Sequence, residues 1–265
     1  MKPAALLLLL ALPASAHEFW IDPQVADGTL TAHLRVGEDL RGDTLSYLPT
    51  TIASMRYLPP GGAAAEIGAR IGDMPAIAGV TLGVPGLHRL AVETLPAYIV
   101  FEDMAEFGDY LAYEGQEAVL GAHQARGLPE TGIAEEYLRH ARALVQVGPV
   151  GAGAGDTSSG MAFELVADGT PFAPDRDTLD LSLTWRGAPE ADTQVAMFHL
   201  PAGGAAGPDT VRGLHRTDAA GRVTVPLAGP GTYLLNAVRI EPAHGPGSVV
   251  WRSHWASLTF TLPSP

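Results

Sequence analysis

Alternation of apolar and polar residues over short segments is the feature that most constrains the fold of this 265-residue chain. Successive side chains of a β-strand point to opposite sides, so alternation predicts strands with one buried face. Clusters of Gly, Pro and Asp between the segments are typical of turns. The chain is therefore predicted to be mainly β. The predicted strands span residues 30–36, 86–92, 179–185, 195–199, 223–227, 233–240 and 254–262.

The predicted strands fall into two groups, which indicates two β-sandwich domains. The first domain is expected over residues 17–147. The second is expected over residues 161–265, where at least five short strands separated by turns are typical of an antiparallel sandwich of roughly 100 residues. Residues 148–160 are rich in Gly, Ala and Ser and are predicted to form a flexible linker between the domains.

A change of periodicity predicts a helical hairpin inserted after the first group of strands, over residues 102–147. Apolar residues recur at helical spacing over residues 104–118 and again over residues 133–144. Asp103 and Glu106 resemble a capping box at the start of the first helix. The charged residues of this region are expected to form a solvated face.

The first sixteen residues have the layout of a secretory signal peptide. Lys2 is followed by an apolar run from Ala4 to Leu12, and Ala14-Ser15-Ala16 forms an A-x-A cleavage site. The run is too short to span a bilayer, which needs about 20 residues. Cleavage after Ala16 would place the mature protein in the periplasm and make His17 its amino terminus.

Charge and cysteine content narrow the classes of partner. The formal net charge is −13 and the chain has no basic run, which argues against nucleic acid as a partner. No second apolar stretch approaches membrane-spanning length, so no membrane insertion is expected after cleavage. The chain has no cysteine, so a metal site would have to use imidazole, amine, carboxylate or methionine sulfur.

An amino-terminal histidine has chelating chemistry that an internal histidine lacks. A free α-amine has a reference pKa of about 7.7–8.0 and an imidazole one of about 6.5, so a metal can displace both protons near neutral pH. His17 is therefore the first candidate metal ligand. The alternative is that cleavage simply happens to fall before a histidine that binds nothing.

Two further histidines are candidate ligands because their strand parity points them inward. His88 shares parity with Leu90 and Val92, and His254 shares parity with Leu258 and Phe260. A buried imidazole needs a polar partner, and a backbone group would serve as well as a metal. The site predicted from the sequence therefore comprises His17, His88 and His254, with their ordinary structural role left open.

The remaining polar patterns favour no catalytic site. His199 shares a strand face with Met197, where core packing is the simpler expectation. The pattern H-E-x-x-H is absent, and so are a G-x-S-x-G nucleophile turn and a complete phosphate-binding loop. The five other histidines are expected to be solvated: His33, His123, His140, His215 and His244.

Several segments together resemble a family of exported proteins that are labelled periplasmic components of cobalt or nickel transport (NikM-like). They cover nearly the whole predicted mature chain and comprise residues 16–21, 36–43, 110–115, 136–139, 217–235 and 255–260. The resemblance implies a carboxy-terminal sandwich similar to transthyretin and carboxypeptidase regulatory domains. It also implies that the amino-terminal segment holds the metal, here without the methionine that precedes the histidine in nickel-binding relatives.

The sequence thus predicts a periplasmic protein that binds or delivers a divalent transition metal, namely nickel, cobalt or copper. Its partners would be the metal ion and a membrane metal transporter. One alternative is a copper-dependent oxidoreductase with a histidine brace, in which His17 and a second imidazole hold the metal. The other is a β-sandwich module that binds a partner without catalysis.

Overall fold

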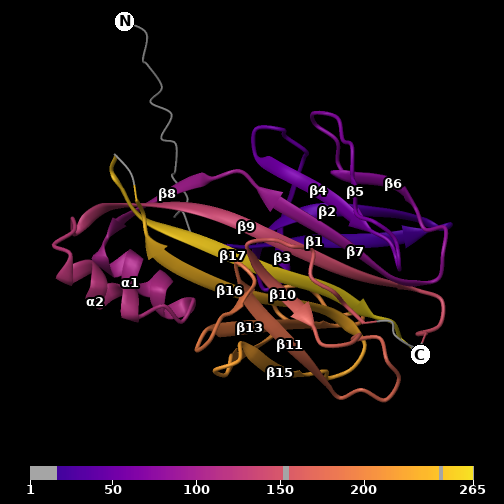
Figure 1. The fold of residues 1–265 in the computed structure, drawn as a ribbon. Helices are drawn as coiled ribbons and strands as arrows, with labels where there is room; N and C mark the ends of the chain where they lie inside the picture. Colours follow the sequence, from indigo (N-terminus) through magenta and orange to yellow (C-terminus); the bar gives the residue numbers. More distant parts are fainter. Residues whose placement is uncertain (1–16, 152–154, 245–246, 265) are drawn as a thin grey trace, which may run out of the picture.

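The structure, a computed structural model, describes residues 17–151, 155–244 and 247–264. The predicted signal peptide, residues 1–16, lies outside the described residues. Within these ranges the chain forms three β-sheets and two short helices (Figure 1). The prediction of a mainly β fold is confirmed. No helix in the described ranges is long and apolar enough to cross a membrane.

The largest sheet, called the central sheet, has nine strands in the described residues. Strand β8 (Ala97–Asp103) pairs with one half of β9 (Thr131–Val147), and β7 (Gly86–Thr94) pairs with the other half along the same edge. Apart from β8, the strands follow one another across the sheet in the order β14 (Val211–Arg216), β13 (Gln194–Pro201), β16 (Gly231–Pro242), β17 (Val249–Leu262), β9, β7, β4 (Ile52–Leu58) and β5 (Ala65–Glu66).

Two smaller sheets lie on either side of the central sheet. The N-terminal sheet contains β1 (Glu18–Ala26), β2 (Thr29–Glu38), β3 (Arg41–Leu45) and β6 (Ile77–Thr81). The C-terminal sheet contains β10 (Phe163–Ala167), β11 (Thr178–Trp185), β12 (Ala188–Pro189) and β15 (Arg222–Pro226).

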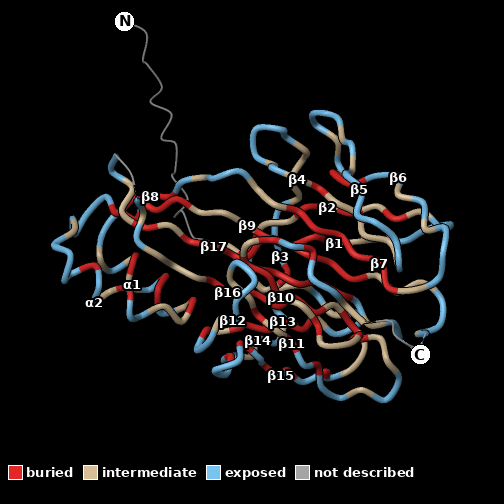
Figure 2. The backbone as a smooth tube through the Cα atoms, viewed as in Figure 1, coloured by how far each residue is buried: buried red, intermediate tan, exposed pale blue. Residues whose placement is uncertain are grey.

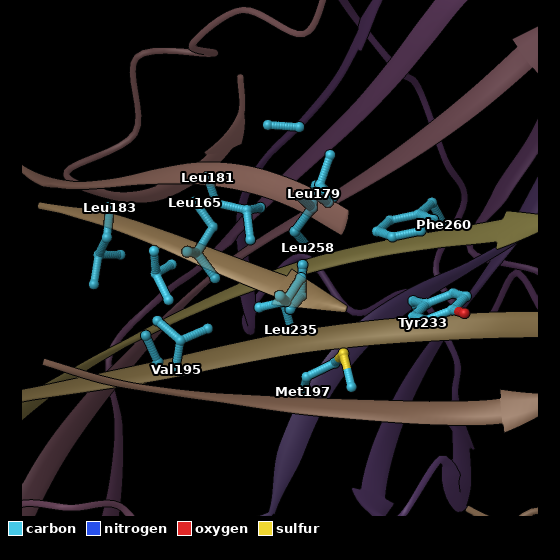
Figure 3. Close-up of a cluster of buried hydrophobic side chains, with 14 of the residues drawn as sticks. Leu165, Leu179, Leu181, Leu183, Val195, Met197, Tyr233, Leu235, Leu258 and Phe260 are labelled. Carbon is cyan, nitrogen blue, oxygen red and sulfur yellow. The ribbon is translucent and has the colours of Figure 1, made fainter. Parts of the chain in front are cut away.

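The middle strands of the central sheet, β13, β16, β17 and β9, are largely buried, and buried segments, drawn red, gather in the middle of Figure 2. Against the C-terminal sheet the central sheet forms the core drawn in Figure 3, where Leu179 and Leu181 of β11 pack with Leu235 and Leu258. The opposite face packs against the N-terminal sheet through Ile21, among others, and against the helices farther along. The molecule is therefore layered, with one sheet common to both cores.

The two predicted sandwich domains share this central sheet. Strand β9 precedes the predicted linker and β17 follows it, yet the two pair in parallel, with Leu138 opposite His254. Antiparallel neighbours can be joined by a tight turn, whereas a parallel pair needs a long connection. Here the whole C-terminal sheet and three strands of the central sheet lie in that connection.

A small helical insertion is present but covers less of the chain than the predicted hairpin of residues 102–147. Helices α1 (Met104–Tyr113) and α2 (Ala118–Ala125) lie between β8 and β9. Asp103 caps α1 as predicted, since its carboxylate accepts hydrogen bonds from the backbone N–H groups of Ala105 and Glu106. The reciprocal bond of a capping box is displaced by one residue, because the Glu106 carboxylate accepts from the N–H of Glu102.

The predicted helix over residues 133–144 is wrong, because this segment is the long strand β9. Both faces of β9 are covered. Ile133 packs with the helices on one face, while Leu144 packs with the C-terminal sheet on the other. A strand buried on both faces has apolar residues at odd and even positions, so its alternation is lost. The helical spacing of its apolar residues is then coincidental.

The described part of the predicted linker is packed against the sheets. The side chain of Asp156 is fully buried and accepts hydrogen bonds from Arg89 and Arg142. Ser159 is also buried and donates its hydroxyl and backbone N–H to Glu164. Residues 152–154 lie outside the described residues. The Gly-rich composition of this segment did not reveal its charged, buried anchor.

Candidate functional site

His17 lies where the N-terminal sheet meets the central sheet. It immediately precedes β1, whose first residue, Glu18, pairs with Gly37 of β2. The guanidinium of Arg139 on β9 donates a hydrogen bond to the His17 carbonyl at 3.3 Å. The His17 backbone is thus held from both sides, which favours an ordered amino terminus if cleavage occurs after Ala16.

The imidazole of His17 lies against an acidic side chain. Its Nδ1 is 3.2 Å from Oε1 of Glu38, the last residue of β2. The two atoms lack hydrogen-bond geometry although they are close. The side chains of both residues are partly exposed, at 37 % and 53 %, although Nδ1 itself is buried.

Beneath His17 lies a buried acidic cluster, defined by Glu18, Glu114 and Glu135. The Tyr113 hydroxyl donates to Glu18 at 3.2 Å, and the Tyr110 hydroxyl donates to Glu135 at 3.2 Å. One oxygen of each carboxyl group has no hydrogen-bond partner within the described part of the chain. Carboxyl groups that lack both water and full pairing favour the protonated form.

Burial dominates the titration of this acidic cluster. It raises the pKa of Glu18 and of Glu135 to about 7. It also raises the pKa of Glu114 well above its usual range, and the neighbouring Glu18 adds to that effect. Arg212 lies over the Tyr113 ring and lowers the pKa of Glu18 slightly. The three carboxyl groups therefore favour bound protons, or another cation, over three unpaired negative charges in the interior.

His254 lies on the opposite face of the central sheet, under the edge of the C-terminal sheet. The Trp185 ring of β11 is 4.4 Å from its ring centroid. Its inward direction was predicted correctly from parity, since it is buried on the face of Ala256 and Leu258. Burial, followed by the neighbouring His140, lowers its pKa to about 3.

His254 belongs to a polar row that crosses the central sheet. His140 Nε2 lies 3.5 Å from His254 Nδ1, and His140 Nδ1 lies 3.3 Å from Glu93 Oε1. At the other end, His254 Nε2 lies 3.7 Å from Glu241 Oε1. The hydrogen bond with His140 lowers the pKa of Glu93. We call these four residues the His140–His254 row.

His88 is buried as parity predicted, but both of its ring nitrogens have protein partners. Nδ1 lies 2.6 Å from the Tyr57 hydroxyl, and Nε2 lies 2.9 Å from the Val84 carbonyl. The carbonyl can only accept, so Nε2 carries the hydrogen and Nδ1 accepts from the tyrosine. This geometry fits a structural histidine whose polar atoms are satisfied.

The structure does not bring His17, His88 and His254 together. His17 and His254 contact opposite faces of the central sheet, and His88 pairs with Val145 toward the other end of β9. Across the described residues, no group of three or more His, Asp or Glu side chains is arranged to hold a metal. Any metal site must therefore combine fewer side chains with a terminal amine, water or another molecule.

Two histidines predicted to be solvated are buried. His123 accepts a hydrogen bond from Trp251 Nε1 at 3.0 Å and lies 2.9 Å from the Pro129 carbonyl. His140 is 5 % exposed. The sequence could have signalled His140 only if β9 had been recognised as a strand, because its parity then matches Arg142 and Leu144. The acidic cluster had no such signal, since its members are far apart in the sequence.

Comparison with known proteins identifies the family of the chain but no characterised relative. No curated protein and no solved structure matches the chain significantly. A family model described as a domain of unknown function, DUF4198, matches residues 14–241. The match includes His17, His88, His140 and the acidic cluster, and it ends before His254. The chain belongs to this family, DUF4198.

Proposed function

We propose that the protein is a periplasmic metal-binding or metal-delivery protein whose mature amino terminus, His17, captures nickel, cobalt or copper. The observation that carries the proposal is the approach of His17 Nδ1 to Glu38 Oε1 at 3.2 Å without hydrogen-bond geometry. Two ligands of one ion lie side by side in this manner. With metal–ligand bonds of about 2.0–2.2 Å, the separation corresponds to a ligand–metal–ligand angle of roughly 100°.

Cleavage after Ala16 would add a third ligand at the same place. The new α-amine and Nδ1 of His17 can bind one metal in a six-membered chelate ring, and Glu38 would add a carboxylate. Imidazole and amine nitrogens suit nickel, cobalt and copper, and the absence of cysteine removes the usual thiolate competitor. The bond from Arg139 to the His17 carbonyl would limit the conformational freedom lost on binding.

The resemblance to NikM-like periplasmic components of metal transport also supports a metal-binding role for the amino terminus. There, too, the amino-terminal segment is expected to hold the metal. A membrane metal transporter would then be the partner that receives it, and the transthyretin-like sandwich would present the site. These two points rest on the resemblance alone, whereas the His17–Glu38 pair stands on its own geometry.

The histidine-brace oxidoreductase is less well supported by the geometry. A brace needs a second imidazole near the amino terminus. His88 has both nitrogens engaged, and His254 faces the C-terminal sheet. The proposed role is therefore capture and handover, without catalysis.

The experiment uses the exported protein, whose intact mass first establishes that it begins at His17. Nickel is then titrated into the wild type and into a His17→Ala variant by calorimetry. We expect the variant to bind at least 100-fold more weakly, because both chelating groups depend on this residue. Affinity for the wild type should fall below about pH 6, since protons then compete for imidazole.

Two further variants sharpen this test. Inserting one alanine before His17 keeps the imidazole but moves the amine, and it should weaken binding nearly as much as His17→Ala. His244→Ala, which removes an exposed loop histidine, should leave the affinity unchanged. Equal nickel affinity in the wild type and in His17→Ala would refute the proposed function, as would a mature protein that begins elsewhere.

A further inference from the structure

The His140–His254 row has two hydrogen bonds and a third, longer approach of 3.7 Å from His254 Nε2 to Glu241, which is more contacts than two neutral imidazoles have N–H groups. It contains three contacts in series, from Glu93 to His140, from His140 to His254 and from His254 toward Glu241. A carboxylate only accepts, so each outer contact needs an N–H on the facing ring nitrogen. Two neutral imidazoles carry two N–H groups in total. If the hydrogen of His254 is on Nδ1, it donates to His140 and leaves the Nε2 lone pair facing the Glu241 carboxylate. If it is on Nε2, two lone pairs face each other between the rings. In either tautomer one contact of the row lacks a hydrogen.

The unfilled contact lies in a buried position. His140 and His254 are each 5 % exposed, their rings are nearly parallel with an interplanar angle of 17°, and Trp185 closes one side. A buried nitrogen lone pair that faces another lone pair or a carboxylate is destabilising unless a proton or a metal ion lies between them. His254 Nε2 has no hydrogen-bond partner within the described ranges, so the row is incomplete at that end.

We propose that His140 and His254 form a second metal site, which takes a divalent cation such as Zn²⁺ through His140 Nε2 and His254 Nδ1. The 3.5 Å separation of these atoms matches two ligands of one ion. With Zn–N bonds of about 2.0–2.1 Å, it corresponds to an N–Zn–N angle of roughly 115–120°, near the tetrahedral value. Water would fill the remaining positions.

The outer shell of the row resembles that of protein metal sites. A ligating histidine usually donates its other ring N–H to a carboxylate, which fixes the tautomer and makes the ligand more basic. Glu93 is placed to do this for His140, and Glu241 is placed near the free nitrogen of His254. Both carboxylates are partly exposed, at 27 % and 24 %, so a hydrated ion can approach the row past them.

Three of the neighbouring arginines, Arg56, Arg239 and Arg252, are paired with carboxylates. Arg56 pairs with Glu93, and Arg239 pairs with Glu190 and Glu241. Arg252 pairs with Glu136, leaving Arg186 to stack on the Trp185 ring. Charge balance therefore does not exclude a dication between the two rings. This site is independent of the proposed amino-terminal site, because it lies on the opposite face of the central sheet.

The test uses the exported His17→Ala protein, so that the amino-terminal site cannot contribute. Equilibrium dialysis against Zn²⁺ should show one bound ion per chain. Adding His140→Gln or His254→Gln should weaken binding at least 100-fold, since each removes one of two ligands. Glu93→Gln should weaken it by about 10–100-fold through the outer shell. Thermal melts of each variant establish that it is folded.

Matched controls separate ligation from general effects on charge or packing. Glu117→Gln removes the same formal charge at an exposed position of the helical insertion, and it should not change the affinity. His199→Gln alters another buried histidine on the face of the same core, and it should not change the affinity either. Lack of a stoichiometric ion, or equal binding in His140→Gln and His254→Gln, overturns the proposal.

The two proposals fail separately. In a protein with the native amino terminus, His254→Gln should keep the nickel affinity assigned to His17. In the His17→Ala protein, Zn²⁺ binding should persist. A chain that loses metal only with His17 supports the amino-terminal site and refutes the second one, and the reverse pattern refutes the first.

Discussion

Replacing Asp156 with alanine should lower the free energy of unfolding by about 3–5 kcal/mol, the cost typical of breaking a buried ion pair from one side. The Asp156 carboxylate is fully buried and accepts from Arg142 at 2.7 and 2.8 Å and from Arg89 at 2.9 Å. Its removal leaves two guanidinium groups inside the protein with less compensation. Leaving a buried charge unpaired costs far more free energy than the intact ion pair contributes to stability.

Urea unfolding followed by tryptophan fluorescence measures this effect. The control is Asp192→Ala, because Asp192 pairs with Arg216 on the surface and its side chain is 86 % exposed. An exposed pair of this kind contributes roughly 0–1 kcal/mol. If Asp156→Ala cost as little as the control, the buried network would not anchor the segment before β10.

Replacing Glu135 with glutamine should make the protein more stable at alkaline pH and change its stability little at acidic pH. The carboxyl group of Glu135 is fully buried, and burial raises its pKa from 4.5 to about 7. The folded form therefore holds this proton more tightly than the unfolded chain does. The resulting stability is complete below pH 4.5 and is lost as pH rises through 7.

The shift from 4.5 to about 7 corresponds to a difference on the order of 3 kcal/mol between the two pH extremes. At pH 8.5 the Glu135→Gln variant should melt about 6–12 °C above the wild type, given the usual relation for chains of this size. At pH 5 the two melting temperatures should nearly coincide. Glutamine keeps an oxygen that accepts from Tyr110, so the hydrogen bond does not obscure the comparison.

The wild type should show a stability maximum in mildly acidic solution. As pH falls from 8.5, the acidic cluster gains protons in the folded state and stability rises. Below about pH 6.5 the lowered pKa of His254 acts in the opposite direction, because the unfolded chain then binds a proton that the folded protein does not. Glu117→Gln, an exposed change beside the same helices, should leave this profile unaltered. A profile that kept its slope in Glu135→Gln would contradict the assignment to this residue.

Strands with one polar face were predictable from the sequence, and strands buried on both faces were not. Strand β11 alternates between buried and partly exposed residues, so its pattern was clear. Strand β9 has no such contrast, and its misinterpretation as a helix also hid His140. Burial of His88 and His254 followed from parity. What each imidazole contacts could not follow, because His140 and His254 meet only through the pairing of β9 with β17.

The same limit applies to the surroundings of His17. Its prediction as a chelating amino terminus follows from a cleavage motif of neighbouring residues in the sequence. Its contacts with Glu38 and Arg139 depend on how β2 and β9 pack, which is not local. Charged residues of the helical segment were expected to be solvated, yet Glu114 is buried next to β16, where Asn236 donates to it at 3.5 Å. A pattern of charge along the chain does not reveal that three carboxyl groups will share one interior.

The position of β17 has a consequence for how the chain folds. This strand lies between β16 and β9, so without it the central sheet divides into two pieces, each with an open edge. The residues of β9 pair with residues of β17 that lie more than a hundred positions later in the sequence. Contacts between residues so far apart in the sequence form slowly during folding. Open strand edges are prone to pair with other chains in the meantime. A folding intermediate that lacks only this strand should therefore aggregate readily, and shielding from other chains would matter most until β17 has inserted.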